Sequence, residues 1–335
     1  PMEPLFYAPI LLAWLLSPIV GWWISKPLVS RVPQLTMDQR VFLRTSARRT
    51  WRYFAQFVGP QDNWLPPDNF QEYPAPAIAT RTSPTNIGMA LLADLAAYDF
   101  GYISAGEFLS RIQNTLETME KLERYLGHFY NWYDTRTLKP LHPQYVSSVD
   151  SGNLVGSLLT LLAGLAELKD QPILSVNAFQ GLQDTLRVLA EHVPALPASD
   201  LAQKIKILEE HLHTLTLNES VQTPTTIDSL LNEMQRIGEE MMACLPTDID
   251  IDGELYYWAQ AFVRQISALQ EDIRYLVPEP QHFNNMPTLS ELAKGDTAGT
   301  ETMMPARASK GALERIKMIN VLANRCRQLA IMDFE

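Results

Sequence analysis

The chain has 335 residues, 46% of them apolar, and it carries a net charge of −11 with only two cysteines. This length and apolar content allow a large core in one or two domains, and the acidic balance argues against a nucleic-acid partner. Cys244 and Cys326 lie far apart in predicted helices, which fits a reducing compartment and argues against a disulfide framework.

The first predicted element is an uncharged apolar run from Leu5 to Ile24, about the length that spans a bilayer. Two prolines and a glycine inside it would weaken a helix in water but are tolerated in lipid, which favours a transmembrane helix over a buried core helix. The Arg-rich stretch that follows predicts that the rest of the chain is cytoplasmic. We therefore expect residues 1–35 to form a transmembrane helix and a basic juxtamembrane segment, in contact with membrane lipid through residues 5–24.

Helix signals dominate from residue 36 to residue 171, and alternating strand patterns are nearly absent. A helix is predicted at about 38–58, with Thr36 or Asp38 near its N-cap. Ser83 is the expected N-cap of the next helix, with Pro84 in its first position and Gly101 as its stop. Two further helices complete this region: one to about Tyr125, opened by a capping box of Ser104 and Glu107, and a very apolar one starting near Ser151 or Asn153.

Residues 172–277 change character and are predicted to form four more polar, Glu-rich helices. Their expected bounds are about 172–193, 199–217, 224–245 and 252–277. The pattern indicates an inserted block, whose helical hairpins could stand away from the main core as an arm. Prolines and glycines then mark a long connection within 278–335, before a last helix at about 308–330.

Four short stretches, expected to be non-helical, gather aromatic and polar side chains beside these helices. They read WLPPDN at 64–69, RTSPTNIG at 81–88, GHFYNWYD at 127–134 and VDSGN at 149–153. A pyranose offers apolar C–H faces and a rim of hydroxyls, which match flat aromatic rings beside carboxylates and amides. The stretches therefore predict a carbohydrate site, in which the donors and acceptors for sugar hydroxyls are Asn69, Arg81, Asn86, Asn131 and Asn153.

Two carboxylates in these loops could serve acid–base chemistry on a glycosidic bond, namely Asp134 and Asp150. The alternative is structural, with Asp134 capping a turn and Asp150 capping the following helix. We expect no metal site, because His211 and His213 point to different faces of one helix, and the loop histidines lack a third partner.

Four motifs in this order resemble the cyclic β-1,2-glucan synthases, very large bacterial inner-membrane enzymes. The motifs are NWLPPDNFQ, RTSPTNIGMALL, GHFYNWYDTRTLKPL and YVSSVDSGNLVG, and the resemblance covers essentially the whole chain, with 172–305 the least distinctive part. It implies the end of a membrane glycosyltransferase followed by the first half of a cyclising transglycosylase domain. The implied fold is all-α: a partial (α/α)6 toroid of helical hairpins, preceded by one transmembrane helix and carrying an inserted helical arm.

The resemblance also implies a chemistry and its participants. UDP-glucose is the donor of the preceding glycosyltransferase domain, whereas the cyclising domain needs no cofactor and passes a linear β-1,2-glucan onto its own non-reducing end. The family's catalytic glutamates are expected beyond Glu335, so the catalytic residues are unknown here, with Asp134 and Asp150 as weak candidates. The implied substrate-binding residues are Trp64, Asp68, Asn69, Arg81, Asn86, Tyr130, Trp132, Asp134, Asp150 and Asn153.

The leading hypothesis is a membrane-bound fragment of such a synthase, with β-1,2-glucan and the rest of its own polypeptide as partners. An endo-β-1,2-glucanase type of glycoside hydrolase is one alternative. A non-catalytic helical scaffold that links membrane and cytoplasmic domains is another. The predicted division is 1–35 membrane segment, 36–171 glucan-binding domain, 172–277 insertion and 278–335 linker and return helix.

Overall fold

The computed structural model describes residues 8–26, 34–193, 200–217, 223–245, 253–295 and 307–333. Its described regular structure is helical apart from three ribbons of two-residue strands, which confirms the predicted all-α class. The chain separates into two units, Pro1–Arg40 and Val41–Glu335.

The first unit contains α1 (Ala8–Ile24), an apolar helix of 17 residues whose side chains are almost all exposed. Residues 5–7 of the predicted membrane span lie outside the described residues. Within the described part of the chain, one helix is long and apolar enough to cross a membrane, and it is α5 (Ser148–Glu167) rather than α1. Leu154, Leu158 and Leu161 of α5 are fully buried in the core, so α5 has the character of a core helix.

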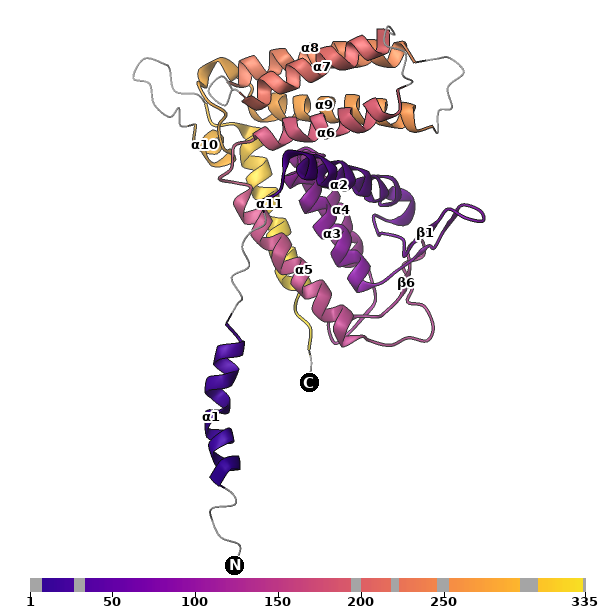
Figure 1. Ribbon diagram of the computed structural model, residues 1–335, viewed down its shortest axis with the longest axis vertical. Coiled ribbons are helices and arrows are strands. Elements are labelled where there is room, and N and C mark those ends of the chain that lie inside the picture. The colour runs from indigo at the N-terminus through magenta and orange to yellow at the C-terminus, as the bar shows by residue number, and fades with distance from the viewer. Residues whose placement is uncertain are drawn as a thin grey trace, which may run out of the picture. The chain divides into compact units, whose positions relative to one another are not determined.

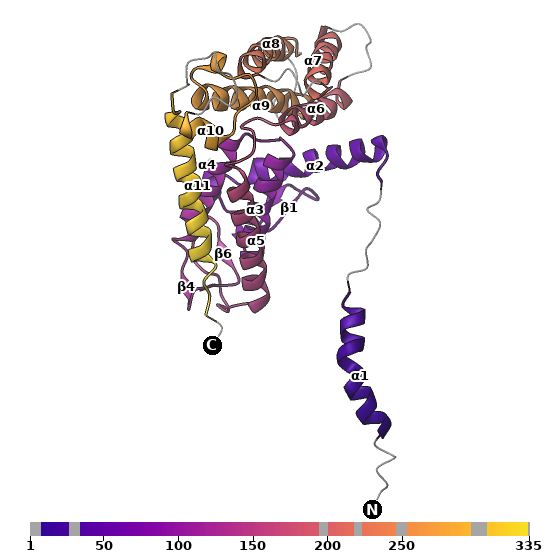
Figure 2. The same ribbon diagram turned by 90° about the vertical axis from the view of Figure 1, so that its left-hand side faces the viewer.

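Most of the remaining helices outside the arm share one hydrophobic core in the second unit. Phe108, Leu116, Phe129 and Leu158 are among its fully buried members. Figures 1 and 2 show α5 and α11 running side by side away from the arm, with α3 and α4 next to them. The helices of this body are α2 (Met37–Phe57), α3 (Pro84–Asp99), α4 (Ala105–Met119), α5, α10 (Leu289–Lys294) and α11 (Lys310–Leu329).

The start of α3 and its stop agree with the sequence signals. The Ser83 hydroxyl accepts a hydrogen bond from the Asn86 N–H at 3.2 Å, Pro84 takes the first helical position, and Gly101 follows with φ of 77°. Only one half of the capping box on α4 forms, since Ser104 accepts from the Glu107 N–H while the Glu107 carboxyl lines two cavities instead. The predicted cap is thus confirmed for the serine alone.

Two predicted helix ends are wrong, and each correction moves residues of interest. Helix α4 ends at Met119 rather than near Tyr125, because β4 (Arg124–Tyr125) turns back to pair with β5 (His128–Phe129). Helix α5 begins at Ser148, with Ser147 as its N-cap, so Asp150 and Asn153 stand inside its first two turns instead of in a loop. The stretch VDSGN is therefore helical, and so is most of RTSPTNIG.

The four predicted arm helices exist and enclose a second hydrophobic core, with Phe179, Leu208, Trp258 and Phe262 among its buried residues. They run crosswise to α3, α5 and α11 in Figure 1. Their bounds are α6 (Val176–Glu191), α7 (Asp200–Leu217), α8 (Pro224–Ala243) and α9 (Glu254–Leu276).

The arm is fastened to the body by polar contacts. Arg44 of α2 pairs with Asp184 of α6 at 2.7 Å, and Gln265 of α9 donates to the Gly101 carbonyl at 2.6 Å. The arm therefore keeps a hydrophobic core of its own and is joined to the body by these contacts. The division of the chain at residue 172 stays a prediction.

Candidate functional site

Helices α3 and α5 place their N-termini side by side. Gly88 of α3 faces Ser157 and Leu154 of α5 so closely that an added Cβ would lie 2.6 Å from the Ser157 hydroxyl, and Gly164 of α5 faces Leu95 of α3 in the same way. Moving forward along α3 from Gly88 to Leu95 therefore corresponds to moving forward along α5 from Ser157 to Gly164, so the two helices run parallel. The loops that precede them therefore meet at one end of the body, where β3 (Arg81–Thr82) pairs with β6 (Tyr133–Asp134).

Asp68 is the centre of the first half of the site. Its Oδ2 accepts from Arg81 Nη2 at 2.9 Å and from Asn69 Nδ2 at 3.2 Å, and its Oδ1 accepts from Asn86 Nδ2 at 3.3 Å. The guanidinium of Arg81 in turn lies over the Trp132 ring, 4.9 Å from the ring centroid. Three of the predicted stretches thus converge on one carboxylate and one indole.

The second half begins at Asn131 and ends on α5. The Asn131 amide satisfies its neighbours in one orientation, in which its oxygen accepts from Trp132 Nε1 at 2.6 Å and Tyr145 Oη at 2.7 Å. Its nitrogen then donates to Asp150 Oδ2 at 2.9 Å. The Thr85 hydroxyl donates to Asp150 Oδ1, and Asn153 Nδ2 donates to Thr85 Oγ1 at 3.1 Å, which closes the path from α5 back to α3.

We call this connected group the loop cluster. Its members come from all four predicted stretches and from the segment between the last two, and several of them are exposed or half-buried. The loop cluster consists of Asp68, Asn69, Arg81, Thr85, Asn86, Asn131, Trp132, Tyr145, Asp150 and Asn153.

Three predicted site residues have other roles in the structure. The Trp64 carbonyl accepts from Thr115 of α4, and the Trp64 ring lies 5.8 Å from the Arg111 guanidinium, away from the contacts of the loop cluster. The Tyr130 ring packs partly against the body core, and its N–H donates to the Tyr133 hydroxyl.

Asp134 is held in a turn. Its Oδ1 accepts from the backbone N–H groups of Thr137 at 2.7 Å and Arg136 at 3.0 Å. These bonds, above all the one from Thr137, hold the pKa of the Asp134 carboxyl below its ordinary value. The geometry favours the structural reading of this residue over acid–base chemistry.

Sequence reasoning missed Thr85 and Tyr145 as members of the loop cluster. Thr85 follows the Ser83–Pro84 cap signal, and its hydrogen bond to Asp150 depends on the parallel packing of two helices that are distant in the sequence. Tyr145 lies in an exposed connection, where no helical or strand period fixes the direction of a side chain. Neither residue carries a local signal that marks it as part of a site.

The chemistry that the loop cluster offers is recognition of a neutral polar molecule. Asp68 and Asp150 are oxygen acceptors, while Arg81 and the three asparagines Asn69, Asn86 and Asn153 supply N–H donors. The Trp132 ring is fixed by contacts on its Nε1 and by the Arg81 guanidinium, so its orientation is set before any ligand arrives. In the described ranges, no group of three His, Cys, Asp or Glu residues could hold a metal ion.

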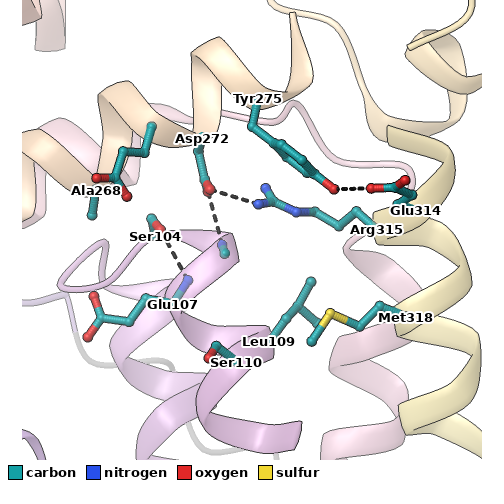
Figure 3. A pocket seen from close by; sticks show the side chains of 12 residues that line it. Ser104, Glu107, Leu109, Ser110, Ala268, Asp272, Tyr275, Glu314, Arg315 and Met318 are labelled. Carbon is teal, nitrogen blue, oxygen red and sulfur yellow. Dashed lines mark hydrogen bonds and ion pairs between the residues drawn. The ribbon is translucent and has the colours of Figure 1, made fainter. Parts of the chain in front are cut away.

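Three sizeable cavities lie elsewhere, and two of them are beside Glu107 on α4. One of about 690 Å³ opens between α4, α9 and α11, where Arg315 Nη2 donates to Asp272 Oδ1 at 2.8 Å and Asp272 Oδ2 accepts from the Gly106 N–H (Figure 3). The other, of about 350 Å³, lies between α2, α4 and α9. Neither cavity is lined by a residue of the loop cluster.

Comparison with known proteins places the loop cluster inside a recognised region. Residues 45–170 match a family described as a protein of unknown function, DUF3131. The chain is also 43% identical over 197 residues to the cyclic beta-(1,2)-glucan synthase NdvB of Rhizobium meliloti. Over these 197 residues, the chain is similar to this cyclic β-1,2-glucan synthase. The resemblance inferred from the four motifs is thereby confirmed for the matched part of the chain, and over the rest it stays a prediction.

The matched region covers 58% of this chain and 7% of the length of that synthase. A solved structure assigned as a glucoamylase from Bacteroides fragilis is 23% identical, covering 58% of this chain and 39% of its own. Its TM-score is 0.27, which is too low for the two arrangements of helices to be equated.

Proposed function

We propose that this chain supplies a glucan-binding wall to a membrane-bound enzyme that cyclises linear β-1,2-glucan by transglycosylation. The observation that carries the proposal is the loop cluster itself, in which four separate stretches converge on two carboxylates and a fixed indole. The sequence relationship to a protein named cyclic β-1,2-glucan synthase supports the choice of β-1,2-glucan as the substrate.

Sugar recognition explains why these residue types stand together. Each hydroxyl of glucose both donates and accepts, so a carboxylate beside an amide or guanidinium satisfies it completely. In this proposal Asp68, Arg81 and Asn86 contact one glucosyl unit, and Asp150 with Asn153 contacts a second. The Trp132 ring stacks on the apolar face of a sugar, and an orientation fixed before binding reduces the entropy cost of that contact.

The reacting groups are assigned to residues outside this chain. Retaining transfer needs a nucleophile and an acid/base about 5 Å apart. In the loop cluster, both carboxylates already accept hydrogen bonds from neighbouring side chains, which suits positioning better than attack. This region would use no cofactor, while UDP-glucose would serve a preceding glycosyltransferase domain.

Attachment to a bacterial inner membrane is part of the same proposal. The support is α1, whose apolar side chains, including Trp14 and Trp22, are not covered by other described parts of the chain. Burial in lipid would remove this surface from water, and a basic segment that follows favours a cytoplasmic position for the body. Release of the chain from vesicles by alkaline carbonate would contradict the membrane span.

Binding of linear β-1,2-glucan tests the proposal directly. Isothermal titration of the full chain, joined to the rest of its catalytic domain, should show binding that Trp132→Ala weakens by about fivefold, since a lost aromatic contact is worth about 1 kcal/mol. Tyr73→Ala is the matched control, because Tyr73 is 87% exposed and outside the loop cluster. Equal affinities for the wild type and Trp132→Ala would remove the indole from the site.

Two other functions make different predictions. An endo-β-1,2-glucanase would release linear oligosaccharides from the same substrate, whereas the cyclising enzyme releases rings, so product analysis separates the two. A non-catalytic scaffold would bind no glucan at all. Deletion of 172–277 with ring formation unchanged would show that the arm is dispensable for chemistry.

A further inference from the structure

Arg48 of α2 is a buried cation without an ionic partner. It is only 4% exposed, and it forms no ion pair with any residue in the described ranges. Its Nε donates to the Thr185 hydroxyl at 2.7 Å, while Nη1 has no hydrogen-bond partner. The two N–H donors on Nη1 thus lack an acceptor among the described side chains and backbone.

The surroundings of Arg48 offset its charge only in part. Its guanidinium lies 4.9 Å from the Trp258 ring centroid and 5.3 Å from that of Tyr102, and such contacts are weaker than an ion pair. The nearby Asp184 carboxylate is already shared by Arg44 at 2.7 Å and Arg187 at 3.0 Å. Burial lowers the pKa of Arg48 below its ordinary value, in line with a charge that lacks full compensation.

The cavity of about 350 Å³ lies directly against this residue. A second cation, Arg264 of α9, lines it and makes no ion pair within the described ranges. Side-chain amides and aromatic rings complete the lining, and Glu107 is its one carboxylate. Burial raises the pKa of Glu107 above its ordinary value. The lining residues used here are Arg48, Arg264, Glu107, Gln56 and Gln260.

We propose that this cavity binds a small oxyanion, a phosphate or carboxylate group, held between Arg48 and Arg264. A guanidinium binds two oxygens of such a group at once, and the amides of Gln56 and Gln260 can donate to the remaining oxygens. The volume lies near the lower end of the range for ligand pockets, about 300–1,000 Å³, which suits a small ligand. This proposal is independent of glucan binding at the loop cluster.

The larger cavity does not offer the same chemistry. Arg315 there is already paired with Asp272, and three further carboxylates, those of Glu107, Glu271 and Glu314, line the same space (Figure 3). An anion would be repelled by this lining. Of the two cavities beside Glu107, only the one of about 350 Å³ is lined by a buried arginine that lacks a carboxylate partner among the described residues, namely Arg48.

Titration with inorganic phosphate tests the proposal on the full chain in detergent. Isothermal titration at constant ionic strength should show one phosphate per chain, and Arg48→Met should weaken binding by at least about tenfold, because charge-assisted hydrogen bonds are lost. Arg264→Gln should cause a smaller loss, and Glu107→Gln should tighten binding several-fold. Arg236→Gln is the matched control, since Arg236 is an exposed arginine of α8 that does not line the cavity.

Each outcome decides the matter. An Arg48→Met chain that still binds phosphate with wild-type affinity would overturn the proposal, and so would the absence of binding to the wild type by both phosphate and acetate. Binding of acetate but not phosphate would identify a carboxylate ligand. If circular dichroism shows that Arg48→Met does not fold, the other two variants still test the proposal. A phosphate affinity equal to that of the wild type in both Arg264→Gln and Glu107→Gln would refute the site.

Discussion

The same ion pair, aspartate with arginine, occurs in two regions of this chain with opposite consequences. In the loop cluster, Asp68 and Arg81 meet at 2.9 Å, and the arginine side chain is 52% exposed. Between α3 and α4, Asp94 and Arg111 meet at 2.6 Å, and their side chains are 2% and 8% exposed. In the proposed function, the exposed pair exchanges its partners for sugar hydroxyls, whereas the buried pair is removed from solvent and holds the helices together.

The buried arginine is bound from three sides. Besides Asp94, it donates to the Phe54 carbonyl at 3.2 Å and the Val58 carbonyl at 3.4 Å, at the end of α2. Its guanidinium also lies 5.0 Å from the Trp51 ring. Arg111 therefore joins α2, α3 and α4.

Loss of this arginine is expected to have the largest effect. Arg111→Met should destabilise the fold by about 3–5 kcal/mol, since it leaves a buried carboxylate without its partner. Denaturant unfolding measures the change. A loss of unfolding free energy below about 1 kcal/mol would show that the buried Asp94–Arg111 pair contributes no more to stability than an exposed pair.

The buried carboxylate should also make stability depend on pH. Burial raises the pKa of Asp94 from 3.8 to about 6 in the folded chain, against the opposing effect of Arg111. Between about pH 4 and pH 6, the unfolded chain loses a proton that the folded chain keeps, so stability falls as pH rises. The fall from this group approaches about 3 kcal/mol for a shift of about two pKa units.

Asp94→Asn measures this contribution. The variant lacks the ionisable group, so its unfolding free energy relative to the wild type should rise between pH 4 and pH 7 and remain constant above that. The difference between the two unfolding free energies isolates Asp94, because every other titrating group is present in both proteins and cancels. A difference that stays flat across this range would show that Asp94 is ionised in the folded chain at acidic pH.

The close approach of the arm to the body predicts an unusual sign for a helix substitution. Alanine normally stabilises a helix interior relative to glycine by about 1 kcal/mol. An added Cβ at Gly181 of α6, however, would lie 2.2 Å from the Gly101 carbonyl oxygen, so Gly181→Ala should destabilise by about 1–3 kcal/mol. Gly156→Ala in α5 is the control, because nothing lies within 4 Å of its added Cβ. Opposite shifts in melting temperature are expected, and stabilisation by both would contradict the contact.

The helices were predictable from sequence because their signals are local. Ser83, Pro84 and Gly101 mark the ends of α3 through capping chemistry that involves only neighbouring residues. The start of α5 was predicted too late, because Ser147 and Ser151 are both acceptable caps and only tertiary packing decides between them. The short helix α10, with its capping box at Thr288, was missed inside a stretch dominated by proline and glycine signals.

The sequence predicted which segments contribute to the candidate site, but not which of their side chains contact one another. Aromatic and amide residues in the four stretches indicated which segments matter, and most of those residues meet in the loop cluster. Trp64 was predicted as a site residue but is not a member of the loop cluster. Its backbone is left-handed, with φ of 61°, and belongs to a turn whose direction no sequence period reveals. The buried charge of Arg48 was equally hidden, since a basic residue in a predicted helix reads as a solvated side chain until its neighbours are known.

The exposed pair should give the smallest change in stability and the clearest change in binding. Arg81→Gln removes the bond to Asp68 and the contact with Trp132, but the side chain is half in water, so the unfolding free energy should change by less than about 1 kcal/mol. Loss of linear β-1,2-glucan affinity at nearly constant stability is the expected pattern, measured by titration and denaturant unfolding on the same preparation. Arg136→Gln is the control: its guanidinium is also exposed and also faces an aspartate, Asp62, but it has no contact with the indole. If Arg81→Gln lowered stability as much as Arg111→Met while sparing affinity, Arg81 would belong to the framework of the fold, and sugar recognition would have to be assigned to the Asp150 half of the loop cluster.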